Sequence, residues 1–406
     1  MYNFIRIGTV GFPSSKYLDI FKFEKINKLT FIIFESEING LDDLYKAAEF
    51  FKINIEDKIE VKYVRQTWLH KQFMRVINKF FKSELLFYYL SGLHFSLKKN
   101  VSEDDILWTG DNDFENTNRY VKCIKKNFNN FLIRTYKETR HRVDNYEKNA
   151  LDYADLLVLP NNAYFDFFKE LYNLDLQDKS IIADLDWRYS GNIKYLNKLK
   201  VEKLSQIDGK FHVCILAGRV IWDKNEKRSA NRYYYVDTIK KLIDLGIIVH
   251  IHARVIIKSN DNPIYEKNNP YELLVKTGKV FIEDMTLYAG SKDYDVLKSY
   301  DAGLLHPLID DTEENIKVKK FQEINIPNRF YEYTMAGVMS IVEKGAGYEM
   351  EKIINDNDFG IVYDNEDDLK SKIEQHKNKY KKFDFSFDQL LSKILHSLDK
   401  NKESKK

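Results

Sequence analysis

A glycine and two basic residues follow an apolar run in the second half of the chain. In KFHVCILAGRVIWDK, Gly218 and Arg219 come directly after a candidate strand, and Lys224 follows a few residues later. Glycine allows close approach to the backbone, and a guanidinium with a nearby ammonium can neutralise a diphosphate from two directions. The run therefore meets the requirements of a nucleotide-diphosphate site. A strand that ends in a solvated basic loop would show the same short pattern.

A helix start is predicted in PNRFYEYTMAG. Pro327 and Asn328 suit its first positions, and Gly337 suits its end. Arg329 and the helix N-terminus would face phosphate groups, while the carboxylate of Glu332 would accept both hydroxyls of a ribose. The alternative is an ordinary amphipathic helix in which Glu332 is only solvated, and spacing alone does not decide between the two.

Candidate catalytic groups follow strands elsewhere in the chain. Asp111 and Asp113, in WTGDNDF, could deprotonate a hydroxyl of a second substrate, or could form a polar turn that caps the next helix. His141, in KETRHRVD, is an alternative base because histidine titrates near neutral pH, although in this basic run it could be a surface residue. His306, before a proline, could reach the same ligand or be a buried histidine at a strand end.

The elements that must position these residues repeat one pattern, a short β-branched or aromatic run followed by a helical segment. In the first half the candidate strands lie at 4–10, 29–34, 59–64, 105–109, 131–135, 156–159 and 181–185. The helical segments between them lie at 41–51, 68–90, 116–126 and 144–154. This alternation predicts right-handed crossovers and a parallel, doubly wound α/β sheet.

The second half repeats the same pattern after a polar, lysine-rich stretch at 189–210. Its candidate strands lie at 211–217, 247–253, 279–282, 302–306 and 340–342, with helices at 232–245, 294–300 and 329–336. A chain of 406 residues exceeds the usual limit of one hydrophobic core, so two domains are expected. We predict Rossmann-like domains at 1–195 and 205–385, and a C-terminal helix with a frayed tail at 386–406.

Composition excludes several classes of protein. A net charge of +2, with 64 basic and 62 acidic residues, gives no reason to expect nucleic-acid binding. Two distant cysteines, Cys123 and Cys214, make neither a disulfide framework nor a cysteine zinc site. The N-terminus lacks a secretory signal and no apolar run reaches membrane-spanning length, so a cytoplasmic location is expected.

The segment 68–90 is amphipathic. Aromatic and aliphatic residues share one helical face and basic residues share the opposite face. Such a helix can lie on an anionic membrane leaflet, which would give a peripheral contact at the inner face of the membrane. The alternative is a core helix with a solvated lysine face.

The order AGRVIWDK, YDAGLLHP and PNRFYEYTMAG resembles the donor domain of GT-B glycosyltransferases, especially those of family 4. The resemblance is strongest over 211–364, and 150–164 resembles the end of that family's acceptor domain. It implies two Rossmann-like domains with parallel sheets facing a central cleft. It also implies that Arg219 and Lys224 hold the donor diphosphate and that Glu332 binds the ribose.

The sequence departs from the family in two places. The family often has a first glutamate that contacts the transferred sugar, but the matching position holds Ile324. The acidic loop 310–314 or Glu323 could substitute for it. The glycine-rich loop of the first domain is also reduced, to Gly8 and Gly11.

The resemblance implies transfer of a sugar from a nucleotide-diphosphate sugar to a glycan or lipid-linked acceptor hydroxyl, in surface polysaccharide or glycoconjugate synthesis. Stabilisation of the departing diphosphate by basic groups needs neither a metal nor a bound cofactor. The same fold also serves sugar-nucleotide epimerases and phosphorylases, and a catalytically silent glycan-binding subunit is a further alternative.

Overall fold

In the computed structural model the chain forms two compact units. The first contains Met1–Ser190 together with Phe385–Lys406, and the second contains Gly191–Asp384. The C-terminal helix therefore belongs to the first unit. The structure describes residues 1–8, 14–35, 40–64, 72, 84–111, 116–136, 145–183, 185–224, 232–253, 255–259, 269–283, 293–309, 316–376 and 383–404.

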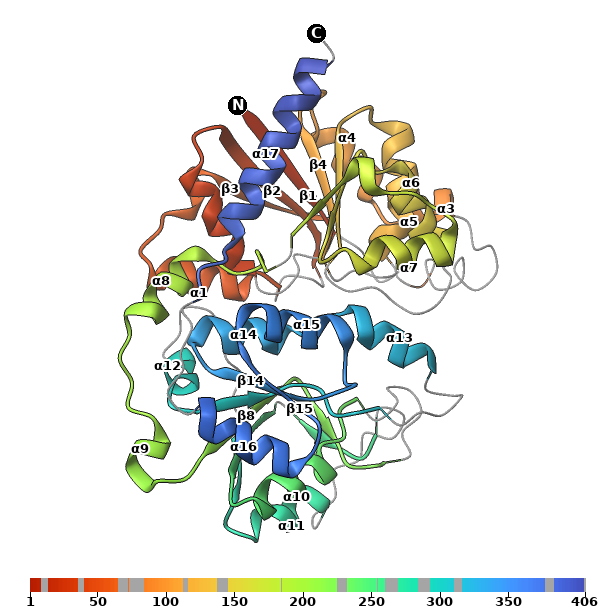
Figure 1. Ribbon diagram of the computed structural model, residues 1–406. Coiled ribbons are helices and arrows are strands. Elements are labelled where there is room, and N and C mark those ends of the chain that lie inside the picture. Colours follow the sequence, from red (N-terminus) through yellow and green to blue (C-terminus); the bar gives the residue numbers. More distant parts are fainter. Residues whose placement is uncertain are drawn as a thin grey trace. The chain divides into compact units, whose positions relative to one another are not determined.

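The first unit is built on a seven-stranded sheet with the order β3-β2-β1-β4-β5-β6-β7 (Figure 1). Every neighbouring pair is parallel, as the alternating pattern predicts. The strands are β1 (Tyr2–Ile7), β2 (Ile26–Phe34), β3 (Ile59–Val64), β4 (Ile106–Asp111), β5 (Leu132–Tyr136), β6 (Leu156–Leu159) and β7 (Ser180–Ile182).

Helices cover both faces of this sheet. They are α1 (Asp42–Phe50), α3 (Glu84–Leu90), α4 (Leu93–Asn100), α5 (Asn116–Asn127), α6 (Asn145–Tyr153), α7 (Ala163–Tyr172) and α17 (Phe387–Ser404), with 3-10 helices η1 (Ser14–Lys22), η3 (Ile55–Asp57) and η4 (Gln177–Lys179). One core joins β1, β2 and β4 to α4, α5 and α6. The opposite face packs against η1 and α17, where Phe387 stacks on Trp108 at a centroid distance of 6.1 Å.

The last helix of the chain lies beside its first strand, and Figure 1 shows α17 running over β1 and β2. The Tyr2 hydroxyl donates to Asp399 at 2.7 Å. The apolar residues that predict a helix in the tail, Phe387, Leu391, Ile394 and Leu398, are all buried. The helix continues to Ser404, further than the apolar spacing indicates.

The second unit has a six-stranded parallel sheet with the order β12-β10-β8-β13-β14-β15. Its strands are β8 (His212–Ala217), β10 (Ile248–Ala253), β12 (Val280–Glu283), β13 (Ala302–Leu304), β14 (Met339–Glu343) and β15 (Gly360–Tyr363), and β9 (Val220–Ile221) pairs with β11 (Ile256–Ile257) beyond them. Its helices are α8 (Ser190–Lys198), α9 (Leu204–Asp208), α10 (Val236–Asp244), α11 (Pro270–Val275), α12 (Asp293–Leu297), α13 (Ile316–Ile324), α14 (Asn328–Ala336), α15 (Tyr348–Asn357) and α16 (Glu366–His376).

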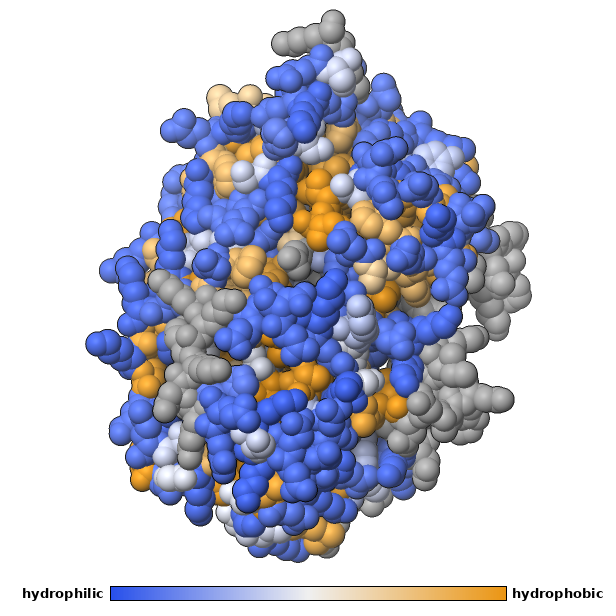
Figure 2. All heavy atoms as spheres, in the orientation of Figure 1, coloured by the Kyte–Doolittle hydropathy of each residue, from blue (hydrophilic) through white to orange (hydrophobic). Residues whose placement is uncertain are grey.

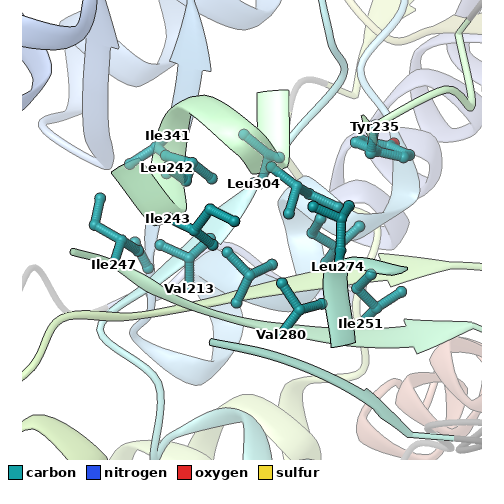
Figure 3. Packing of buried hydrophobic residues seen from close by; sticks show 14 of the residues in the cluster. Val213, Tyr235, Leu242, Ile243, Ile247, Ile251, Leu274, Val280, Leu304 and Ile341 are labelled. Carbon is teal, nitrogen blue, oxygen red and sulfur yellow. The ribbon is translucent and has the colours of Figure 1, made fainter. Parts of the chain in front are cut away.

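The core of the second unit lies between the sheet and helices α10, α11 and α16. Figure 3 shows the part of this core that lies around α10 and α11. Val213, Ile251 and Leu304 of the strands share this core with Leu242 of α10 and Leu274 of α11, and all are at most 5% exposed. Helices α13, α14 and α15 lie on the opposite face of the sheet (Figure 1). Both faces are covered, which explains why these strands are nearly continuous apolar runs.

The amphipathic segment 68–90 falls mostly outside the described residues, apart from Gln72 and α3. Its membrane contact stays a prediction. Of the helices that the structure describes, none combines the length and the apolar character that crossing a bilayer requires. Figure 2 shows hydrophilic side chains over most of one face, with apolar side chains in smaller patches between them.

Each sheet reverses its strand order next to its first strand. In the first unit the reversal lies between β1 and β4, and in the second unit between β8 and β13. Ligands of open α/β sheets bind outside the carboxyl ends of the strands at such a reversal. The two reversal points are therefore where functional side chains are expected.

Candidate functional site

Tyr333 closes the gap where β8 and β13 separate. Its hydroxyl accepts from the backbone N–H of Leu216 at 2.9 Å and faces the carbonyl oxygens of Leu304 and Cys214 at 3.2 and 3.3 Å. The ring lies against Gly303, where a Cβ would come within 2.4 Å of ring carbons. Helix α14 is therefore fixed to the end of β8, the strand that leads into the basic loop.

Helix α14 begins at Asn328, after Pro327 at the N-cap, and ends at Gly337 in the left-handed conformation with φ 72°. The predicted end at Gly337 is confirmed. All residues from Arg329 to Ala336 are buried, so the helix is not solvated on one face. Glu332 is 6% exposed and accepts a hydrogen bond from the Tyr294 hydroxyl at 2.7 Å. The alternative of a merely solvated Glu332 is wrong.

Arg329 places a buried guanidinium in the first turn of α14. It is 9% exposed, donates from Nη1 to the Tyr235 hydroxyl, and lies 5.6 Å from the centroid of the Tyr235 ring. The Tyr235 backbone N–H donates in turn to the Tyr271 hydroxyl at 3.0 Å. Buried tyrosines therefore fix the guanidinium beside the helix N-terminus.

Arg232 and His306 form a second basic contact. Arg232 donates from Nε to His306 Nε2 at 3.2 Å, and its guanidinium lies 5.1 Å from the ring centroid of Phe321. Burial, aided by the charges of Arg232 and Arg329, holds the pKa of His306 well below its usual value. The imidazole is therefore neutral, and because Nε2 accepts from Arg232, Nδ1 carries the hydrogen.

Arg219 completes the group. It is exposed at the end of β8, and its guanidinium lies 5.2 Å from the centroid of the Tyr233 ring, while that of Arg232 lies 5.8 Å from the same ring. Within the described part of the chain, no carboxylate pairs with Arg219, Arg232 or Arg329. We call these three arginines with His306 the basic cluster. Such a cluster suits an anion with several oxygens, because each guanidinium can offer two parallel donors.

The other two predicted residues of the basic loop lie differently. The Lys224 Nζ lies 2.9 Å from a carboxylate oxygen of Asp237, and both side chains are about half exposed. Gly218 is exposed, and a Cβ there would meet no atom within 4 Å. The fold itself does not need glycine at this position, so the open space beside it is left for a ligand or solvent.

Of the predicted catalytic residues, only Asp111 lies in a described element. It is the last residue of β4, and its side chain, together with Asp113 and His141, lies outside the described residues. The preceding Gly110 accepts from buried Arg6 on β1, which also donates from Nε to the Tyr17 hydroxyl at 3.0 Å. Arg6 thus fixes the end of β4 at the reversal point of the first unit. The catalytic roles stay predictions.

Acid should destabilise the second unit through its buried histidines. Burial lowers the pKa of His252 to about 4, and its Nε2 lies 2.7 Å from the Tyr300 hydroxyl. Below pH 6.5, the approximate pKa of histidine in the unfolded chain, the unfolded chain binds a proton that the folded chain does not bind. We therefore expect His252 to leave the free energy of unfolding unchanged above pH 6.5 and to lower it by about 3 kcal/mol near pH 4. Denaturant unfolding across this range, with His252→Gln as the non-titrating control, should show a smaller acid loss in the variant.

The comparisons with known proteins show the fold. No protein-family model and no curated protein sequence matches the chain. It is similar to Anabaena HepE solved with UDP and glucose (12% identity, TM-score 0.51, 98% of this chain and 100% of that one). It is also similar to S. aureus MnaA solved with UDP (13%, 0.51, 98% and 97%) and to an E. coli trehalose-6-phosphate protein bound with UDP-2-fluoro glucose (11%, 0.52, 93% and 91%).

The chain therefore has the GT-B fold, and the prediction of two Rossmann-like units, each with a parallel sheet, is confirmed. At identities of 10–13% such likeness shows the fold alone. Similarity to family 4 in particular stays a prediction.

Proposed function

We propose that the chain is a glycosyltransferase that takes a sugar from a uridine-diphosphate sugar and transfers it to an acceptor hydroxyl. The observation that supports this most is the basic cluster, whose arginines have no carboxylate partner among the described residues and lie at the β8/β13 reversal beside the start of α14. A diphosphate supplies the missing negative charge, and the helix N-terminus adds donors to it. Similar structures hold UDP or a UDP sugar, which supports uridine as the base.

The chemistry follows from this placement. When the bond between the sugar and the diphosphate breaks, negative charge grows on the leaving oxygen, and preorganised guanidinium donors stabilise it. No group of three histidine, cysteine, aspartate or glutamate side chains that could hold a metal occurs among the residues with described placement. We propose metal-independent transfer of a hexose, with Asp111, Asp113 or His141 as the base that deprotonates the acceptor. The acceptor would be a glycan or lipid-linked sugar of a surface polysaccharide.

Glu332 is the proposed ribose ligand. Its buried carboxylate is held by Tyr294 and follows Arg329 within α14 by less than one turn. We expect Glu332→Ala to weaken UDP binding by at least tenfold, because a charge-assisted hydrogen bond contributes about 1.5–3 kcal/mol. Titration calorimetry measures this, and Glu332→Gln, which keeps an acceptor for Tyr294, is the control for packing. An unchanged UDP affinity in Glu332→Ala would remove the ribose role.

The function is tested by incubating the purified chain with UDP sugars and acceptor glycans. Thermal unfolding with each nucleoside diphosphate should show a rise in midpoint for UDP, since a ligand of the folded state stabilises it by mass action. Product analysis then identifies the reaction. Sugar transfer supports the proposal, interconversion of donors without acceptor indicates an epimerase, and a requirement for phosphate indicates a phosphorylase. Binding of glycan without turnover indicates a silent subunit.

A further inference from the structure

Tyr233 contacts two residues of the basic cluster at once. The guanidinium carbon of Arg219 lies 5.2 Å from the centroid of its ring, and that of Arg232 lies 5.8 Å from the same centroid. The face of an aromatic ring carries partial negative charge, so it attracts a guanidinium within about 6 Å. One neutral ring thus holds two positive charges that would otherwise repel each other.

A ring can position an arginine without using its hydrogen-bond donors. A carboxylate in the place of Tyr233 would pair with the guanidinium groups, and an incoming anion would have to displace it. The ring face attracts the charge but takes none of the N–H groups, so these stay available for phosphate oxygens. The contact therefore suits arginines that must be in place before their ligand binds.

Arg219 depends most on this contact. Its side chain is exposed at the end of β8 and, in the part of the chain that the structure describes, makes neither a hydrogen bond nor an ion pair. A long side chain that is free before binding loses conformational freedom when a ligand fixes it, and this loss weakens binding. Because the Tyr233 ring restricts Arg219 in the unliganded protein, less freedom remains to be lost.

The backbone fixes the place of the Tyr233 ring. The N–H of Ile221, on β9, donates to the Tyr233 carbonyl oxygen at 3.0 Å. The buried Tyr271 hydroxyl donates to the Ile221 carbonyl oxygen at 2.9 Å and accepts from the Tyr235 N–H at 3.0 Å. Both polar groups of Ile221 are thus joined to the tyrosine segment 233–235. Since Ile221 comes only two residues after Arg219, the fold sets the distance between Arg219 and the ring.

The two following tyrosines have other roles. Tyr235 belongs to the hydrophobic core of the second unit, and Tyr234 packs against that core and donates to Asp237 at 3.2 Å. The half-buried ring of Tyr233 contacts guanidinium groups instead. Its position is therefore explained by the basic cluster, and not by core packing.

We infer that Tyr233 is a positioning residue that holds Arg219 and Arg232 in place for the diphosphate of the donor. The inference rests on the proposed function, which supplies the diphosphate. Tyr233 acts through the two guanidinium groups and does not itself contact the nucleotide. Its loss should therefore weaken binding of the phosphates and leave binding of the nucleoside unchanged.

Titration calorimetry with UDP and with uridine tests this role. Tyr233→Leu should bind UDP about tenfold more weakly than the wild type, which corresponds to about 1.4 kcal/mol, with unchanged affinity for uridine. Tyr233→Phe keeps the ring and should stay within about twofold of the wild type. Tyr234→Leu is the matched control, because it removes the adjacent half-buried ring, and it should bind UDP within about threefold of the wild type.

Fluorinated phenylalanines at position 233 separate attraction from packing. Each added fluorine weakens the negative charge on the ring face with little change in size, so UDP affinity should fall stepwise from phenylalanine to its trifluoro form. This series tests the inference even if Tyr233→Leu does not fold. Equal affinities across the series would overturn it, because a ring that only fills space would give that result. A Tyr233→Leu variant that binds UDP as tightly as the wild type, or that loses uridine affinity, would also overturn it.

Inorganic pyrophosphate separates this inference from the proposed function. If the wild type binds pyrophosphate but not UDP, the proposed donor is wrong. The positioning role is then supported if Tyr233→Phe binds pyrophosphate like the wild type and Tyr233→Leu binds it more weakly, and it is refuted if all three bind it equally. A wild type that binds neither ligand refutes both.

Discussion

Replacing Arg329 by methionine should lower UDP affinity about 100-fold while leaving the unliganded protein at least as stable as the wild type. Truncating one partner of a buried charge pair with a phosphate costs about 2–5 kcal/mol, and 100-fold corresponds to about 3 kcal/mol. In the unliganded protein the Arg329 guanidinium is 9% exposed with a tyrosine hydroxyl as its hydrogen-bond partner. Replacing such a buried charge by an apolar side chain is often neutral or stabilising.

The opposite signs of the two effects distinguish a binding site from a structural contact. If Arg329 served only the fold, its methionine variant would lose unfolding free energy and UDP affinity together. Calorimetry with UDP and with uridine separates the phosphate from the nucleoside, since only UDP binding should fall. Lys224→Met is the comparison for an exposed, ion-paired lysine. It should lower UDP affinity less, because a surface charge is screened by solvent. A methionine variant that binds UDP as tightly as the wild type would overturn the assignment.

The strands of the fold could be predicted because each is a short apolar run between polar segments. The prediction for β3 matches its observed bounds of Ile59–Val64, and that for β10 differs by one residue at its start. The helix expected from Arg232 instead begins at Val236. Apolar spacing does not show that Arg232 and the following tyrosines turn away from the helix to meet His306 and Arg329, because those contacts come from elements distant in sequence.

The candidate site was predictable only where one segment supplies both the residue and its position. Arg329 and Gly337 share a helix with recognisable start and end residues, so their roles in that helix could be read locally. The position of Gln322 on α13 could not be predicted in this way, because the carbonyl oxygens that its side chain contacts lie in loops after two separate strands. The sheet against which the C-terminal helix packs could not be predicted either, because an apolar face shows that a helix is packed but not against which sheet.

Gly303→Ala should be among the most damaging substitutions of the second unit. A Cβ at this position would lie 2.4 Å from carbons of the Tyr333 ring, which is itself fully buried and cannot move into solvent. Moving the ring removes the hydroxyl from the Leu216 N–H, so an unsatisfied buried donor adds to the overpacking. Overpacking and a lost buried hydrogen bond each cost about 1–3 kcal/mol, giving an expected loss of about 3 kcal/mol or more in unfolding free energy.

A smaller side chain at position 333 should relieve the damage. Tyr333→Leu alone removes the hydroxyl contacts and leaves a cavity, and it should also weaken UDP binding because the end of β8 that carries Arg219 loses its link to α14. In the Tyr333→Leu background the Cβ of Gly303→Ala meets a smaller side chain. Adding Gly303→Ala there should lower the free energy of unfolding by less than about 1 kcal/mol. Urea unfolding of the four proteins of this cycle measures the coupling. Additive losses would show that Gly303 is required for a reason other than the tyrosine ring.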